Sequence, residues 1–216
     1  ESKRHLILRT ALFQTLSREL GGRFAVGSDQ FIYWNARNPS LRLAPDVFVS
    51  KSKADFVFDS WKTWEHGSPD LAVEIISSSD ACEAEWNRKL ERYQEAGVQE
   101  LVRFDPEAPS SSRVRVWDRV QGDLLERAAQ GDLCQCATLS LYWIVVEEPL
   151  LGAVLRLARD PEGAAMVPTL DEALGEQARL RVEEAQLRVE EGRLRSLAEQ
   201  RVAELEDELR KLRTRK

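Results

Sequence analysis

Residues 70–76 read Asp-Leu-Ala-Val-Glu-Ile-Ile. After Asp70 every residue of this run is apolar except Glu74. Short apolar runs of this kind are typical of strands that lie inside a sheet. A strand of this kind would place the Glu74 carboxylate among apolar neighbours, where an unpaired charge is costly. Glu74 therefore needs a partner, and the sequence leaves two kinds open: a structural arginine or a bound cation.

Helical and strand-like patterns follow one another on both sides of this run. Helices are predicted over residues 6–20, before Gly21 and Gly22, and over residues 82–96, after N-cap candidates at 77–80 and before Gly97. Residues 51–68 show no clear period and predict a loop that could cover a site. Strands are predicted at 24–34 (a pair or one bent strand), 41–49, 101–104, 114–117, 124–127, 139–146 and 151–157. This order predicts an α/β fold with a mixed β-sheet flanked by helices.

Two further residues could share a site with Glu74. Asp46 interrupts an apolar segment, so its carboxylate either caps a turn after Pro45 or binds a cation. Lys89 borders the apolar face of the helix predicted at 82–96, from which its side chain can reach solvent or a cleft. Carboxylate oxygens suit Mg²⁺ or Mn²⁺, and an ammonium group can orient an attacking water and offset charge at a phosphate. Asp46, Glu74 and Lys89 therefore suggest hydrolysis of a phosphodiester.

Five other positions are secondary candidates. Asp70 follows Pro69 at the start of the apolar run and is a possible helper. The carbonyl oxygen of Ile75 or its neighbour Ile76 could add a metal ligand, because the same strand would pass the metal. Arg88 and Arg92 either contact phosphates or pair with glutamates on their own helix.

Composition narrows the classes of function and partner that remain possible. The net charge of −6 argues against a broad nucleic-acid surface but not against a local basic cleft. The three cysteines show no zinc-site spacing and are expected to be reduced thiols of a cytoplasmic protein. His5 and His66 lack a nearby nucleophile motif and are expected at the surface or at an edge. No apolar run approaches the ~20 residues that cross a bilayer, so no membrane partner is expected.

The composition changes beyond Pro168, which predicts a globular domain over residues 1–168 and a helical tail over residues 169–216. A seven-residue repeat begins at Arg179, and its apolar stripe comprises Leu180, Leu187, Leu194, Val202, Leu205, Leu209 and Leu212. This spacing predicts a coiled coil, in a homodimer or with another protein, in either orientation. The alternative is a single solvated helix that Glu–Arg pairs stabilise.

Taken in order, these motifs resemble the bacterial putative restriction endonuclease family, a branch of the PD-(D/E)xK nuclease superfamily. The likeness covers most of residues 1–172 and runs through 44–47, 60–65, 67–79, 89–93, 96–98, 105–106, 155–160 and 168–169. Position 76, where such nucleases usually carry the lysine, is Ile76. In this branch the lysine comes from the following helix, which Lys89 matches. Ser78, where members often have proline, and Arg103, within an apolar strand, depart from the pattern.

The resemblance implies a restriction-endonuclease-like domain that cleaves DNA with Mg²⁺ or Mn²⁺. Asp46 and Glu74 would bind the metal, and Lys89 would assist the water. An additional N-terminal acid often assists the metal in this superfamily, and Glu1 and Glu19 are candidates that no motif selects.

Two other functions stay open. The negative charge and the long tail favour a catalytically silent interaction module that recruits partners through a coiled coil. A metal-dependent hydrolase of small phosphorylated compounds would need no basic surface.

Overall fold

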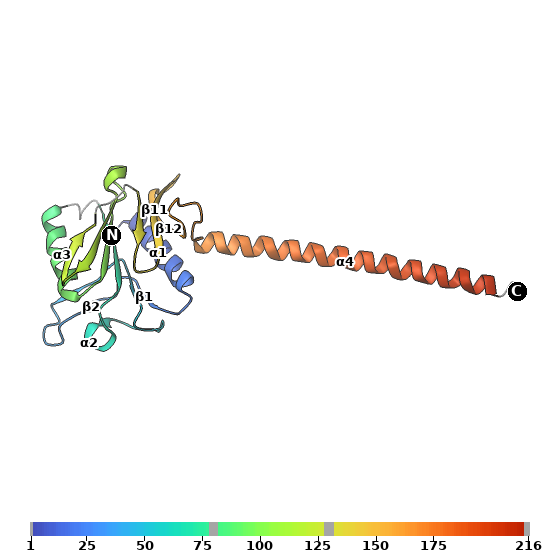
Figure 1. Ribbon diagram of the computed structural model, residues 1–216, viewed down its shortest axis with the longest axis horizontal. Helices are drawn as coiled ribbons and strands as arrows, with labels where there is room; N and C mark the ends of the chain where they lie inside the picture. Colours follow the sequence, from blue (N-terminus) through green and yellow to red (C-terminus); the bar gives the residue numbers. More distant parts are fainter. Residues whose placement is uncertain (1, 78–81, 128–131, 214–216) are drawn as a thin grey trace. The chain divides into compact units, whose positions relative to one another are not determined.

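The computed structural model describes residues 2–77, 82–127 and 132–213, and its contacts divide the chain into two units, Glu1–Leu170 and Asp171–Lys216 (Figure 1). The first unit is α/β with a mixed sheet, which confirms the predicted fold class. The second is formed by one long helix, α4 (Leu170–Arg213).

A six-stranded mixed sheet forms the centre of the first unit. Its order is β1 (Ala25–Gly27), β4 (Val47–Ser50), β6 (Leu71–Ile75), β7 (Glu100–Phe104), β8 (Val114–Val120) and β9 (Asp123–Glu126). Only β6 and β7 are parallel among its paired strands. A parallel pair needs a long crossover, and helix α3 (Glu83–Ala96) supplies it, carrying Lys89 next to the strand that carries Glu74.

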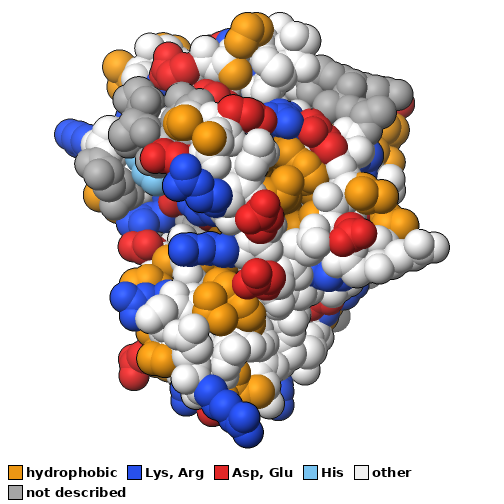
Figure 2. Space-filling view, turned by 90° about the vertical axis from the view of Figure 1, so that its left-hand side faces the viewer, with side chains coloured by type: hydrophobic (Ala, Val, Ile, Leu, Met, Phe, Trp, Pro, Cys, Tyr) orange, Lys and Arg blue, Asp and Glu red, His pale blue; other side chains and the backbone are white. Residues whose placement is uncertain are grey.

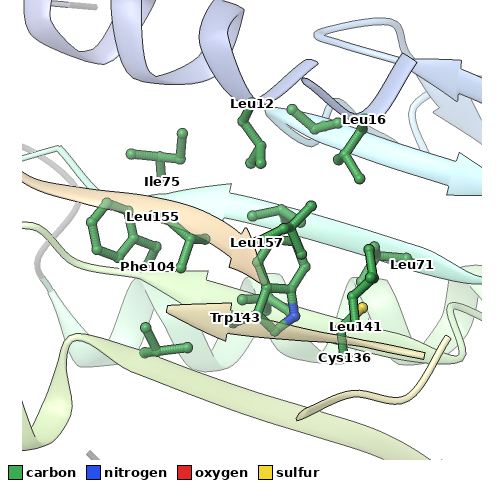
Figure 3. Close-up of a cluster of buried hydrophobic side chains, with 14 of the residues drawn as sticks. Leu12, Leu16, Leu71, Ile75, Phe104, Cys136, Leu141, Trp143, Leu155 and Leu157 are labelled. Atoms are coloured by element: carbon green, nitrogen blue, oxygen red, sulfur yellow. The ribbon is translucent and has the colours of Figure 1, made fainter. Parts of the chain in front are cut away.

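Side chains of β6 alternate between the two faces of this sheet. Leu71, Val73 and Ile75 pack with α1 (Lys3–Leu20), β11 (Leu141–Glu148) and β12 (Gly152–Ala158), as Figure 3 shows for several of them. Ala72 belongs to the opposite core cluster with α3, and Glu74 contacts that helix. Burial on both faces accounts for the continuous apolar run, and the two-residue period directs Glu74 to α3.

Two smaller sheets differ from the strands that were predicted from the sequence. β10 (Leu133–Cys136) joins β11 and β12 and was not predicted. The continuous strand predicted over 41–49 is wrong, because β3 (Arg42–Leu43) pairs with β2 (Ile32–Tyr33) while β4 belongs to the central sheet. Pro45 lies in the break between them, where a missing backbone N–H costs no ladder hydrogen bond.

The loop predicted over residues 51–68 contains regular structure. It holds β5 (Trp61–Lys62), which pairs with β2, and the short helix α2 (Thr63–His66). Trp61 is fully buried and packs against the ring of Phe48. Hydrophobic burial of this aromatic side chain therefore orders a segment whose sequence has no period.

Both predicted helices of the first unit are confirmed, and each ends at a glycine with a left-handed backbone. Gly21 ends α1 at φ 55°, and Gly97 ends α3 at φ 82°. Of the N-cap candidates at 77–80, residues 78–80 lie outside the described residues. The residue that precedes α3 is Cys82, whose side chain makes no capping hydrogen bond.

Helix α4 is 44 residues long, and nearly all of its described side chains are exposed. Ion pairs one turn apart join Arg188 to Glu184 and Arg195 to Glu199. Leu180, Leu187 and Leu194 are each more than half exposed, so the apolar stripe remains accessible to a partner helix. Pairing through α4 stays a prediction. Among the described helices, none combines the length and the apolar character that a membrane crossing requires.

Candidate functional site

Glu74 is buried in β6, where only 3% of the residue is exposed. Its Oε2 accepts a hydrogen bond from Nζ of Lys89 at 2.6 Å, and its Oε1 accepts one from the hydroxyl of Tyr93. Lys89 and Tyr93 are four residues apart on α3 and therefore lie on the same side of the helix. Tyr93 is fully buried while the Lys89 side chain is 39% exposed, so the ammonium group reaches Glu74 from the solvent side.

Asp46 approaches the same region from the neighbouring strand. It directly precedes β4, which is antiparallel to β6, and only 6% of the residue is exposed. Its Oδ2 accepts a hydrogen bond from the backbone N–H of Ile75 at 2.7 Å. Its Oδ1 lies 2.8 Å from Nε2 of His5 on α1. The carboxylate is thus held by groups from two different elements.

The structural arginine that could have paired with Glu74 pairs elsewhere. Arg103 lies opposite Glu74 in the parallel β6–β7 register. Its guanidinium instead lies 3.6 Å from Asp105 and stacks over the ring of Trp86, 5.2 Å from the ring centroid. These contacts explain how β7 accommodates Arg103, and among the described residues they leave Lys89 as the cationic partner of Glu74.

Burial changes the proton affinity of this cluster. The pKa of Glu74 is raised because burial removes the carboxylate from water, and the negative charge of Asp46 raises it further, while Lys89 and Tyr93 partly oppose the shift. Burial and the charge of Glu74 also raise the pKa of Tyr93 well above its usual value, so this phenol stays a proton donor. Burial and the nearby Asp46 carboxylate therefore both favour the protonated form of Glu74 in the metal-free protein.

The raised pKa of Glu74 predicts a pH-dependent cost to the metal-free fold. The folded state binds the Glu74 proton more tightly than the unfolded chain, so the contribution of Glu74 to the free energy of unfolding falls as pH rises above about 4.5. Urea unfolding in EDTA from pH 4.5 to neutral should therefore show Glu74→Gln gaining stability relative to the unmodified protein.

Glu126 provides the control of opposite sign for this measurement. A hydrogen bond from Arg115 lowers the pKa of Glu126, so its contribution is present above the unfolded value and is lost as pH falls. From pH 4.5 to neutral, Glu126→Gln should therefore be less stable than the unmodified protein by a roughly constant amount, and this deficit should shrink as pH falls below about 4.5. Parallel curves for both variants would contradict the assigned direction at Glu74.

Other predicted residues lie in different surroundings. Asp70 precedes β6 at the end opposite Glu74, where its Oδ2 accepts a hydrogen bond from the Lys51 backbone N–H, so it is not brought to the site. Glu19 is also excluded, because it pairs through both oxygens with Arg159. Glu1 lies outside the described residues.

His5 was expected at the surface or an edge, but the structure places it against Asp46. Its side chain is only 15% exposed. The signal in the sequence was its position three residues before Leu8, at the start of the face that continues through Leu12 and Leu16. Which strand this face meets depends on long-range packing, so the contact with Asp46 could not be read from the spacing.

Two hollows flank the site. One, of about 280 Å³, is lined by residues that include His5, Ile75 and Ile76. The other, of about 370 Å³, is lined by Leu43, Ala44, Glu85, Arg88, Lys89 and Arg92. Figure 2 shows a face on which Lys and Arg side chains gather beside a histidine, with acidic side chains scattered around them. The positive charge is therefore local, on a chain whose net charge is −6.

The donors present fit a small divalent cation. Asp46 and Glu74 offer carboxylate oxygens, and a bound cation would offset both the cost of burying the Glu74 carboxylate and its repulsion from Asp46. Among the described residues, no group of three or more His, Cys, Asp or Glu side chains could hold a metal. An ion bound here would therefore take its remaining ligands from backbone carbonyls, water or substrate, as Mg²⁺ commonly does.

A sequence model of the Uma2 family, described as "Putative restriction endonuclease", matches residues 1–147. No curated protein matches the chain. Among solved structures, the chain is similar to a putative nuclease belonging to DUF820 from Anabaena variabilis ATCC 29413, with 13% identity, coverage of 64% of this chain and 74% of that chain, and a TM-score of 0.44. A likeness this distant carries no weight for the site, whereas the family match spans more than half of the chain.

Proposed function

The chain belongs to the Uma2 family of putative restriction endonucleases, and we propose that it is a metal-dependent endonuclease that hydrolyses DNA phosphodiester bonds. The observation that carries the proposal is the meeting of two buried carboxylates, from adjacent strands, with a lysine whose Nζ lies 2.6 Å from Glu74. Two acids and a lysine are the groups that such hydrolysis needs.

Each side chain has a distinct role in this proposal. Asp46 and Glu74 would bind one Mg²⁺ or Mn²⁺, and the Ile75 carbonyl would be a further ligand. The bound ion would act as a Lewis acid and lower the pKa of a water molecule. Lys89 would orient the attacking water and offset the charge that develops on the phosphate. The Ile75 N–H and Tyr93 hydroxyl restrict the orientation of the Asp46 and Glu74 carboxylates, respectively.

Arg88 and Arg92 are the proposed contacts to the DNA backbone. Both are exposed on α3 and line the same hollow as Lys89, and neither forms an ion pair within the described part of the chain. Replacing both with alanine should weaken DNA binding at low salt and reduce the slope of log affinity against log salt by roughly two. Fluorescence anisotropy with a labelled duplex over a range of salt concentrations measures both the affinity for DNA and its dependence on salt.

A charge-matched control exists on α4. The double variant Arg188→Ala with Arg195→Ala removes the same charge from a helix in the second unit. Its salt slope should equal that of the unmodified protein. Equal slopes for both double variants would count against Arg88 and Arg92 as phosphate contacts.

The exposed stripe of α4 supports a separate proposal about assembly, namely that two copies of the chain pair through this helix. The Glu–Arg pairs along α4 are equally compatible with a solvated single helix. The mass of the particle in solution, measured by light scattering with and without Leu187→Glu, distinguishes the two. A monomer that neither binds metal nor cleaves DNA, but retains a partner through α4, would instead indicate an interaction module.

Nicking of supercoiled plasmid tests the main proposal. Cleavage should require Mn²⁺ or Mg²⁺ and should stop when EDTA is added. Hydrolysis of small phosphodiesters without plasmid nicking would indicate the alternative hydrolase, and absence of both activities together with absence of metal binding would refute the catalytic assignment.

A further inference from the structure

His5 occupies the first turns of α1, on the face that the helix buries. The leucines that follow it at helical spacing, Leu8, Leu12 and Leu16, are at most 4% exposed and pack in the same core as β6 and β12. Figure 3 shows Leu12 and Leu16 among them. These leucines anchor α1 against the sheet without help from the imidazole. The position of His5 is consequently fixed by the helix.

The imidazole and a backbone group engage the two oxygens of one carboxylate. Nε2 of His5 lies 2.8 Å from Oδ1 of Asp46, and the Ile75 N–H donates to Oδ2 at 2.7 Å. Contacts at both oxygens, one from α1 and one from β6, restrict rotation about the bond that carries the carboxylate. With contact at only one oxygen, the carboxylate would be restrained by the Ile75 hydrogen bond and by packing alone.

We propose that His5 is a positioning residue of the site, which fixes the Asp46 carboxylate in the orientation from which it would bind the metal. The consequence for metal binding rests on the proposed function, whereas the orientation of Asp46 is a property of the metal-free protein. Groups that orient metal-binding side chains commonly change metal affinity by about 10- to 100-fold when they are removed.

The hollow beside His5 relates this positioning role to metal binding. The hollow of about 280 Å³ is lined by both His5 and Ile75, the two residues that contact Asp46. Its wall also includes Arg4 and Glu107, which form an ion pair with each other. His5 therefore lies between the buried carboxylate and space that water or an ion can enter.

The first measurement follows the orientation of Asp46 in EDTA. The Ile75 amide proton reports its hydrogen bond to Oδ2, so its NMR resonance should move upfield and its exchange with solvent should accelerate in His5→Ala. His5→Gln, whose amide nitrogen extends to a similar position, should restore both values toward those of the unmodified protein. The matched control is His66→Ala, which removes the other histidine, located in α2, and should leave the Ile75 amide unchanged.

The second measurement is calorimetric titration with Mn²⁺ alone. His5→Ala should weaken Mn²⁺ binding about tenfold, His5→Gln should recover most of the affinity, and His66→Ala should bind as the unmodified protein does. A lowered melting temperature of His5→Ala with an unchanged Ile75 amide would show a merely structural histidine and would overturn the inference. So would unchanged Mn²⁺ affinity in a protein that does bind Mn²⁺.

Failure of the proposed function would look different. If the unmodified protein binds no Mn²⁺ and nicks no plasmid, but the Ile75 amide responds to His5→Ala and not to His66→Ala, the metal-dependent nuclease is refuted. His5 would still be shown to position Asp46.

Discussion

Replacing Glu74 with glutamine is expected to reduce Mn²⁺-dependent plasmid nicking by about 10³-fold or more and to weaken Mn²⁺ binding. The substitution keeps the size of the side chain, and its carbonyl oxygen can still accept one of the hydrogen bonds from Lys89 and Tyr93. It removes the charge that would bind the ion. Charge stabilisation by a metal contributes several kcal/mol to phosphoryl chemistry, and each 1.4 kcal/mol or so corresponds to a tenfold change in rate.

Loss of the fold would not explain this loss of activity. The pKa of Glu74 is raised by burial, so a neutral amide should cost the metal-free protein less than the carboxylate does at neutral pH. Urea unfolding of Glu74→Gln in EDTA should therefore show stability at least equal to that of the unmodified protein. The variant should also lose the rise in melting temperature that Mn²⁺ produces by binding the native state.

Asp70→Asn is the matched control because it removes an acid from the other end of the same strand. Asp70 accepts from the Lys51 backbone and lies away from the two carboxylates, so its variant should bind Mn²⁺ and nick plasmid normally. Asp46→Asn should resemble Glu74→Gln. Metal binding that survives the double variant Asp46→Ala with Glu74→Ala would contradict the assignment of both ligands.

The central strand and the helix after it could be predicted because their signals are local. A buried strand must be apolar on both faces, and β6 is apolar at every position except Glu74. Gly97 adopts φ 82°, a conformation that glycine takes at little cost, and this ended the predicted helix at the right place. Burial of Glu74 followed from the same pattern, whereas its direct hydrogen bond with Lys89 was not predicted, because the sequence left an arginine or a bound cation as its partner.

The rest of the site depends on which elements meet, which local patterns do not encode. Asp46 was assigned to one long strand because most of residues 41–49 are apolar, but that segment divides between two sheets. His5 reaches Asp46, which lies about 40 residues further along the chain, only because α1 packs over the sheet that contains β6. β10 was missed because it is a short strand with a polar residue, Gln135, and its pairing with β11 decides its structure.

Lys89→Ala is expected to lower kcat by about 10²- to 10³-fold while Mn²⁺ affinity is maintained or increased. The ammonium group is proposed to act on the water and the phosphate, and loss of one such electrostatic contact has an effect of this size. In the metal-free protein, however, Lys89 donates a hydrogen bond to Oε2 of Glu74, so an incoming cation must compete with Lys89 for that oxygen. Removing it leaves that oxygen available, so binding and catalysis should change in opposite directions.

Thermal unfolding measures the effect of Lys89→Ala on Mn²⁺ binding separately from its effect on kcat. Lys89 lowers the pKa of Glu74, so its removal should raise that pKa further and destabilise the metal-free fold near neutral pH. Mn²⁺ should then raise the melting temperature of Lys89→Ala by more than it raises that of the unmodified protein. Lys62→Ala, which removes an exposed lysine paired with Glu65, should change neither quantity. If Lys89→Ala instead weakened Mn²⁺ binding as strongly as Glu74→Gln, Lys89 would be organising the metal site, and the proposed role at the water would be wrong.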